Sequence, residues 1–307
     1  MGRLLFTFYK MQRDRRNNLI HLHFIVFIWG FTAILGKLIS IDSMPLVWYR
    51  MAIAWLVIYG YLKVKKRNLK VDRKSLYWLI GAGIVVALHW VTFFLAIKIA
   101  TVSVALAMMS TGAFFTAILE PFVFKRKIVL YEVILGLVVV AGLYLIFQVQ
   151  ANHMFGIAIA LVSAFLSAVF SLINSKLVKT HLPSVISLYE LGIGTLFLSI
   201  ILLFRGSFTS EFFNLSSEDW FYLLLLAVIC TAYAFIASVK VMRVLTPYTV
   251  MLTTNLEPVY GIILAWLLFG AKEQMDLLFY IGGIIILATV VADGYLKHRY
   301  SIKDKRT

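Results

Sequence analysis

A carboxylate and a proline stand side by side inside a long apolar stretch, at Glu257 and Pro258. Proline has no backbone N–H, so in a helix the carbonyl of Thr254 would lose its partner. A carboxyl group beside a free carbonyl could hold a substrate ammonium group or carry a proton. The alternative is a structural carboxyl that is hydrogen-bonded to a neighbouring helix. Asn255 precedes the pair, and Tyr260 would face roughly the same way as Glu257, three residues away.

Further polar and aromatic residues stand in equally apolar stretches, where ionisable groups are costly and usually face protein or water. Arg50 could attract a carboxylate, or it could be a helix-packing or interface arginine with its stem in lipid and its head at the surface. Glu190 could line an inner vestibule or reach water. His89 and Trp90 could stack on or bond to a flat substrate, although a core histidine with one hydrogen-bonding neighbour is the alternative. Trp29 could line a cavity or set a close helix contact.

The sequence offers no pattern for a metal, a nucleotide or a covalent catalyst. His21 and His23 are two residues apart, which does not place both on one face of a helix. The Gly192-x-Gly194 pair is not followed by the Lys-Ser/Thr of a phosphate loop. Cys230 is the single cysteine, which excludes a disulfide within the chain. We therefore expect no cofactor and no metal.

The composition indicates a membrane protein. The chain has 307 residues, of which 62% are hydrophobic and 14% charged, against about 45–50% and about 25% in soluble domains. The mean hydropathy is +0.93. Too few polar residues are present to cover a water-soluble globule, and disordered chains are poor in apolar residues.

Ten apolar stretches are long enough to cross a bilayer, since about 20 residues of helix span about 30 Å of hydrocarbon. The chain is therefore predicted to be an all-α integral membrane protein with ten transmembrane helices. Short linkers leave no room for a soluble domain. The predicted spans are 19–39, 45–62, 76–97, 102–124, 130–148, 154–175, 183–204, 220–239, 247–269 and 277–296.

The distribution of basic residues predicts the orientation. With ten spans, 24 of the 29 Lys and Arg residues fall on the side of the N-terminus and 4 on the other side. Positive residues concentrate in the cytoplasm, so both termini, the basic segment 1–18 and the basic tail 297–307, are expected there. This topology and anionic lipid account for the net charge of +15 without nucleic acid. The basic start and first apolar run could be a signal peptide, but the run is long and lacks a clear cleavage site, so we expect an uncleaved span.

The two halves of the chain resemble each other, as 19–148 and 154–296. Each half has five spans, an odd number, so the second half must enter the membrane from the opposite side. Such an inverted repeat places the site near the midplane, between the halves. One chain is then sufficient, and a homodimer is the alternative. The aligned residues are Trp78, Phe93 and Lys98 with Trp220, Phe235 and Lys240, and Pro45 with Pro183.

Several segments resemble the drug/metabolite transporter superfamily, EamA type. The resemblance covers about residues 19–296 and implies a ten-helix inverted repeat that moves small metabolites, often outward. The sequence departs from the family pattern at Ala271, where Glu is common, and at Gly112, where Pro is expected. The segments are Trp29-Gly30, Lys37, Pro45 and Arg50, then Ala96-Ile97-Lys98, Asn255-Leu256-Glu257-Pro258-Val259-Tyr260-Gly261, Phe269-Gly270 and Gly282-Gly283.

These observations together predict a secondary active transporter in the cell membrane, the inner membrane of a bacterium. We expect an exporter of small amphipathic metabolites that works by alternating access, and the resemblance implies amino acids or related compounds. A proton or another ion is the expected coupling partner if the substrate gradient alone does not drive transport. The alternatives are a multidrug or lipid-linked substrate transporter, the latter requiring a lateral opening. An intramembrane enzyme is a remote alternative, since no Ser–His–Asp or His-Glu-x-x-His pattern is present.

Overall fold

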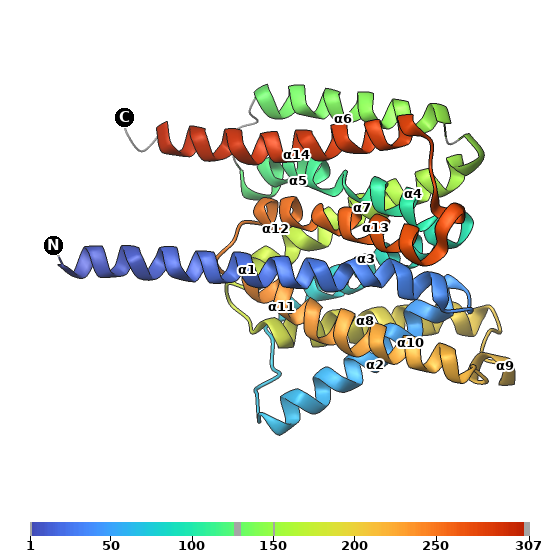
Figure 1. Ribbon diagram of the computed structural model, residues 1–307. Helices are drawn as coiled ribbons and strands as arrows, with labels where there is room; N and C mark the ends of the chain where they lie inside the picture. Colours follow the sequence, from blue (N-terminus) through green and yellow to red (C-terminus); the bar gives the residue numbers. More distant parts are fainter. Residues whose placement is uncertain (1, 126–129, 150, 304–307) are drawn as a thin grey trace.

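The computed structural model describes residues 2–125, 130–149 and 151–303, which are helical and contain no strand. The helices pack side by side into one bundle (Figure 1). They are α1 (Gly2–Leu38), α2 (Ser43–Val64), α3 (Arg73–Ile99), α4 (Val102–Met109), α5 (Gly112–Phe124), α6 (Leu130–Val149), α7 (Met154–Leu177), α8 (Pro183–Phe204), α9 (Ser210–Phe213), α10 (Ser217–Ala227), α11 (Ala234–Val241), α12 (Pro247–Thr254), α13 (Leu256–Phe269) and α14 (Leu277–Lys303), with short turns η1 (Ala151–His153), η2 (Val228–Tyr233) and η3 (Gly270–Glu273).

Eight helical stretches within the described ranges are long and apolar enough to cross a membrane. The two other predicted spans lie on α6 and α14, where the apolar stretches found are the shorter Leu137–Ile146 and Leu277–Thr289. Residues 2–18 of the predicted basic segment 1–18 form the first part of α1. Residues 304–307 of the predicted tail lie outside the described residues. The eight stretches are Arg13–Leu38, Ser43–Val64, Arg73–Ile99, Val102–Phe124, Met154–Leu177, Pro183–Phe204, Ser217–Val241 and Pro247–Glu273.

Three of these stretches are interrupted near their middle, which the sequence analysis did not predict. The stretch 102–124 breaks into α4 and α5 at Ser110 and Thr111, where the Thr111 hydroxyl donates to the Met108 carbonyl over 2.7 Å. The stretch 247–269 breaks into α12 and α13 at Asn255, three residues before Pro258. Between α10 and α11, the π-helical turn η2 widens the helix. Broken helices and π-turns free backbone groups and are frequent at functional sites.

The helices pack into one bundle with α3 near its centre. α3 contacts α7 and α8 most extensively, α8 also packs on α2, and α1 packs on α13. α6 and α14 lie side by side along one edge (Figure 1). α1 begins and α14 ends at the same end of the bundle (Figure 1). Segments from both halves of the chain are therefore neighbours throughout.

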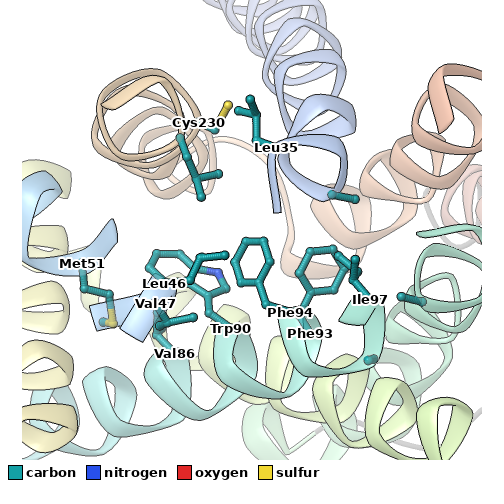
Figure 2. Close-up of a cluster of buried hydrophobic side chains, with 14 of the residues drawn as sticks. Leu35, Leu46, Val47, Met51, Val86, Trp90, Phe93, Phe94, Ile97 and Cys230 are labelled. Carbon is teal, nitrogen blue, oxygen red and sulfur yellow. The ribbon is translucent and has the colours of Figure 1, made fainter. Parts of the chain in front are cut away.

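Aromatic side chains of α3 form the centre of the largest apolar cluster. Trp90, Phe93 and Phe94 project from neighbouring positions on one side of α3 toward α1 and the chain around Cys230 (Figure 2). Phe94 is fully buried, and a Cβ at Gly36 on α1 would clash with its ring. Small residues let helix backbones approach closely, which is how helices associate without a hydrophobic driving force in lipid.

Replacing Gly83 by valine is expected to lower the free energy of unfolding by about 1–3 kcal/mol, the usual cost of overpacking. A Cβ at Gly83 would lie 2.7 Å from the backbone carbonyl oxygen of Glu190 and 2.9 Å from the Cβ of Ile193, so α3 and α8 must separate. Gly81→Val is the matched control, because nothing lies within 4 Å of a Cβ there. Thermal unfolding followed by circular dichroism in detergent measures both, and equal midpoints would contradict the close contact.

Candidate functional site

A small cavity lies at the core of the bundle, lined by residues from α1, α2, α3, α7, α11, α12 and α13. Its volume is about 70 Å³, which holds a few water molecules, whereas pockets for small organic ligands are commonly about 300–1,000 Å³. Its polar lining residues are Thr32, Arg50, His89, Ser167, Ser171, Ser238, Thr254 and Glu257, and its aromatic ones are Trp29, Trp90, Phe93, Phe170 and Phe235.

Arg50 brings a positive charge into this cavity. The side chain is 2% exposed, so it does not reach an interface in the way the alternative reading of the sequence required. Its guanidinium carbon lies 3.9 Å from the centre of the Trp90 ring, a cation–π contact, and its Nε–H donates to Thr231 Oγ1. Nη1 is buried without a hydrogen-bond partner. The guanidinium is thus fixed on one side and has a free donor on another.

Glu257 brings a carboxyl group into the same cavity. It is the second residue of α13, directly after the break at Asn255, and is 9% exposed. In the described part of the chain, no ion pair within 4.0 Å joins its carboxyl to Arg50 or to any other basic group. The cavity therefore presents a basic and an acidic group at separate points of its wall.

The π-turn η2 supplies the hydrogen bonds that fix two of these side chains. Thr231 within it accepts from Arg50, and the carbonyl of Cys230 accepts from Trp29 Nε1 over 3.2 Å. The Thr231 hydroxyl in turn donates to the Leu226 carbonyl, five residues earlier. In a regular α-helix, Cys230 and Thr231 would be oriented differently toward Trp29 and Arg50. The local widening therefore has a direct effect on the site.

His89 lies on the cavity wall and is held by α7. Its Nδ1 is 2.9 Å from both the carbonyl and the hydroxyl oxygen of Ser163, and its ring lies 5.4 Å from that of Phe170. When Nδ1–H donates to the Ser163 carbonyl, Nε2 remains as an acceptor. His89 therefore has a hydrogen-bonding neighbour, as the alternative expected, and it also lines the cavity.

Three buried polar groups of the cavity have no hydrogen-bond partner among the described residues: Thr32 Oγ1, Arg50 Nη1 and Ser171 Oγ. An unpaired buried polar group costs about 1–3 kcal/mol, so such groups are normally satisfied by water or a ligand. Their presence around one cavity indicates a site for a polar molecule.

Of the residues proposed from the sequence, five line this cavity: Trp29, Arg50, His89, Trp90 and Glu257. Three others do not. Asn255 is buried at the break between α12 and α13, and its Nδ2 has no partner. Tyr260 packs edge-on against Phe27, with ring centres 5.6 Å apart. Glu190 is 0% exposed and accepts a hydrogen bond from Asn174, so it does not reach water.

A row of serines on α7 was not predicted as part of the site. Serine recurs at every fourth residue, at Ser163, Ser167, Ser171 and Ser175, which places these hydroxyls along one helix face. Ser167 and Ser171 line the cavity, and Ser163 holds His89. This spacing within an apolar stretch was the signal that could have identified them.

A larger hollow of about 770 Å³ lies between α3, α5 and α7. Its walls are mostly apolar, and three exposed lysines, Lys74, Lys125 and Lys176, stand in its lining. The ammonium group of Lys176 lies 5.8 Å from the centre of the Trp78 ring. An apolar wall with a basic rim suits a molecule with an apolar chain and an anionic head.

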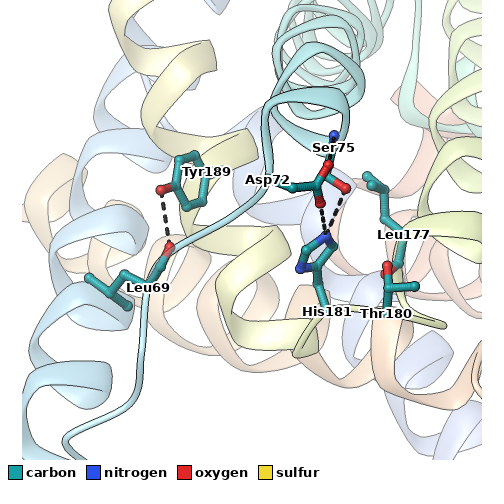
Figure 3. A network of polar contacts seen from close by, with 7 residues as sticks. All are labelled: Leu69, Asp72, Ser75, Leu177, Thr180, His181 and Tyr189. Carbon is teal, nitrogen blue, oxygen red and sulfur yellow. Dashed lines mark hydrogen bonds and ion pairs between the residues drawn. The ribbon is translucent and has the colours of Figure 1, made fainter.

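A polar network ties the start of α3 to the loop before α8 (Figure 3). Asp72 accepts from the backbone N–H of Ser75 over 2.9 Å and lies 3.3 Å from His181 Nε2. His181 Nε2 is also 2.8 Å from Ser75 Oγ, and the Tyr189 hydroxyl donates to the Leu69 carbonyl. The side-chain and backbone hydrogen bonds from Ser75 lower the pKa of the Asp72 carboxyl to about 2.

This lowered pKa predicts a loss of stability in acid. The contribution of Asp72 is present above its ordinary pKa of 3.8 and is lost as the pH falls through about 2. We expect the thermal midpoint of the wild type to fall between pH 4 and pH 2 more steeply than that of Asp72→Asn. Asp42→Asn is the matched control, since Asp42 is the N-cap of α2 without a side-chain cap hydrogen bond. Equal slopes for wild type and Asp72→Asn would contradict the prediction.

Comparison with known proteins agrees with this architecture. The model of the EamA-like transporter family matches residues 19–148 and 154–292. Two uncharacterized transporters of Archaeoglobus fulgidus are similar: one is 25% identical over 290 residues, 92% of this chain and 98% of the relative. The other is 24% identical over 266 residues, 86% of this chain and 91% of the relative. A solved crystal structure shares the fold with a TM-score of 0.68 at 15% identity, over 93% of this chain and 99% of that one.

Eight apolar helical stretches of membrane-spanning length and a family match over both halves of the chain lead to one conclusion. The chain belongs to the EamA-like transporter family and is a multi-pass membrane transporter.

Proposed function

We propose that the protein is a secondary active transporter that exports small amphipathic zwitterions, amino acids or related metabolites. The observation that carries the proposal is a single cavity lined by Arg50 and Glu257, which do not pair with each other within 4.0 Å. A zwitterion carries a carboxylate for the free Nη1 of Arg50 and an ammonium group for Glu257. Charged groups in a buried site interact more strongly than in water, which favours a ligand that complements both Arg50 and Glu257.

The aromatic wall supports the amphipathic part of the proposal. Trp90, Phe93, Phe170 and Phe235 surround the charged pair and offer apolar faces to a substrate side chain. Trp90 and Phe235 also pack edge to face, with ring centres 5.6 Å apart. Aromatic faces attract cations as well, so a substrate ammonium group near them gains a further contact.

Alternating access is supported by the size of the cavity and by the helix contacts. A volume of about 70 Å³ is too small for a metabolite, so the helices must move to admit one. The contacts occur in reciprocal sets: α1 packs on α13 as α7 packs on α5, and α3 packs on α8 as α10 packs on α2. Reciprocal contacts of this kind are expected of a 5+5 inverted repeat that rocks about the site. The distribution of basic residues supports a cytoplasmic position for both termini.

Counterflow in proteoliposomes tests the proposal. Vesicles are loaded with unlabelled amino acids and related small metabolites, and labelled members are added singly outside. We expect saturable uptake that requires the matching internal solute, and we expect Glu257→Gln to reduce it at least tenfold because the ammonium group loses its counter-charge. Glu218→Gln is the matched control, since Glu218 is exposed on α10. Uptake of anionic or cationic compounds in preference to zwitterions would contradict the proposed substrate class.

A lipid-linked substrate is the second candidate, favoured by the hollow between α3, α5 and α7. Its lysines could hold an anionic head group while its apolar walls hold the chain. Replacing Lys74, Lys125 and Lys176 by glutamine would then abolish movement of such a substrate across the bilayer. The same triple variant would leave zwitterion counterflow unchanged, which separates the two candidates.

A further inference from the structure

A second group of buried polar side chains lies apart from the substrate cavity. It consists of Asn174 on α7 with Ser187 and Glu190 on α8, and all three are 0% exposed. Asn174 Nδ2 donates to Glu190 Oε2 over 3.3 Å. Glu190 Oε1, Asn174 Oδ1 and Ser187 Oγ have no hydrogen-bond partner among the described residues. We refer to these three residues as the Glu190 cluster, which contains three unpartnered oxygens.

The Glu190 cluster contains an acid without a basic partner. No Lys, Arg or His of the described chain lies within 4.0 Å of the Glu190 carboxyl. α2, α3 and α11 pack on α8, and the buried basic groups of α2 and α3 are engaged elsewhere: Arg50 on Thr231 and Trp90, and His89 on Ser163. Lys240 of α11 and Lys176 of α7 are exposed.

A buried carboxylate without a counter-charge costs several kcal/mol, so the charge that neutralises Glu190 must come from solution. A proton suits the cluster better than a metal ion, because α3 and α8 approach closely beside it. A Cβ on Gly83 of α3 would lie 2.7 Å from the backbone carbonyl oxygen of Glu190. A metal ion needs several oxygen ligands and room for itself, whereas a proton needs only an acceptor. A protonated Glu190 can donate to the unpartnered oxygen of Asn174 or Ser187.

The Glu190 cluster is linked to the cavity along α7. Ser171 lines the cavity and precedes Asn174 by three residues, so the two side chains lie on adjacent positions of one helix face. The Ser171 hydroxyl is itself without a partner. Unpartnered oxygens therefore continue from the substrate cavity to Glu190.

We propose that the Glu190 cluster binds the proton that is coupled to transport, at a site separate from the substrate cavity. The proposal rests on the proposed transport function and assigns the coupling step to Glu190 instead of Glu257. Substrate charge is met in the cavity, and the proton is carried between α7 and α8. Movement of these helices against α3 would expose Glu190 alternately to the two sides.

Two transport modes in proteoliposomes test this assignment. Counterflow without a pH gradient reports the substrate cavity, and accumulation driven by an imposed pH gradient reports coupling. We expect Glu190→Gln to keep counterflow within about threefold and to lose the gradient-driven accumulation completely, while Glu218→Gln retains both. Gradient-driven accumulation by Glu190→Gln would overturn the proposal, as would wild-type accumulation that needs a sodium gradient and ignores pH.

A milder variant covers the case in which Glu190→Gln does not fold. Ser187→Ala removes one acceptor for the proton and is expected to move the pH midpoint of gradient-driven accumulation about 0.5–1 unit lower. An unchanged midpoint would count against the cluster.

Proton binding can also be measured without a substrate, so that failure of the transport function is recognised separately. In acid-induced infrared difference spectra, we expect the protonated-carboxyl band to lose the component of one buried acid in Glu190→Gln and to keep that component in Glu257→Gln. Absence of counterflow for every compound would then refute the proposed function alone. Persistence of the full band in Glu190→Gln would refute proton binding at Glu190.

Discussion

Substrate counterflow is expected to fall more than tenfold when Arg50 is replaced by lysine, although the positive charge is kept. The guanidinium carbon lies 3.9 Å from the centre of the Trp90 ring, Nε donates to Thr231, and Nη1 remains for the cavity. A lysine ammonium is a compact point charge that cannot make these three contacts at once. A tenfold loss corresponds to about 1.4 kcal/mol, the scale of one charge-assisted hydrogen bond.

Two further variants show whether the loss comes from geometry. Thr231→Val removes the acceptor that fixes Nε and is expected to weaken counterflow in the same direction but by less than Arg50→Lys. Arg205→Lys is the matched control, because Arg205 is exposed at the end of α8. Counterflow in proteoliposomes measures all three variants. Full activity of Arg50→Lys would mean that only a diffuse positive charge is needed there, and the directional contact with a carboxylate would be excluded.

Replacing Glu273 by alanine is expected to lower the free energy of unfolding by about 2–5 kcal/mol. The side chain is 1% exposed, and its carboxyl oxygens accept from the backbone N–H groups of Val102 and Ser103 over 3.1 and 3.0 Å. Oε2 also accepts from Ser103 Oγ over 3.0 Å. Alanine leaves two buried N–H donors at the start of α4 unpaired, each costing about 1–3 kcal/mol. Thermal unfolding in detergent measures the loss.

The neighbouring Lys272 provides the control for Glu273. It is exposed on the same turn, η3, so Lys272→Ala is expected to change the midpoint little. Glu273→Gln is expected to lie between the two, because its amide oxygen still accepts while its NH₂ group meets a backbone donor. A midpoint of Glu273→Ala equal to that of Lys272→Ala would show that water replaces the carboxyl, and the joint between η3 and α4 would then be unimportant for stability.

The sequence by itself determined that the chain is a helical membrane protein and which family it resembles. Apolar stretches of about 20 residues are a local property, and their lengths follow from the thickness of the bilayer. The resemblance seen in Trp29-Gly30, Arg50 and the segment around Glu257 is confirmed by the family match over residues 19–148 and 154–292. Polar residues in such stretches also stand out one by one, because each is costly to bury.

Only the tertiary structure decided which of these polar residues share a cavity. Arg50 and Glu257 are far apart in the chain and meet because α1, α2, α3, α7 and α13 converge on one small space. Helical periodicity gives the face on which a residue lies but not which neighbouring helix that face contacts. Glu190, equally conspicuous in the sequence, packs instead against Asn174. Glu273, which no sequence pattern singled out, joins η3 to Ser103 of α4, 170 residues earlier in the chain.

The breaks within the helices likewise could not be determined from the sequence alone. Spans 102–124 and 247–269 each look like one helix because they are apolar over their whole length, although polar residues of low helix propensity stand at the breaks, at Thr111 and Asn255. Pro258 stands just after the second break and Gly112 just after the first, where the Thr111 hydroxyl also donates to a carbonyl one turn back. The π-turn η2 likewise depends on what Thr231 and Cys230 meet across the bundle. Local sequence sets which segments are helical, and the contacts between helices determine where they bend and which charges face one another.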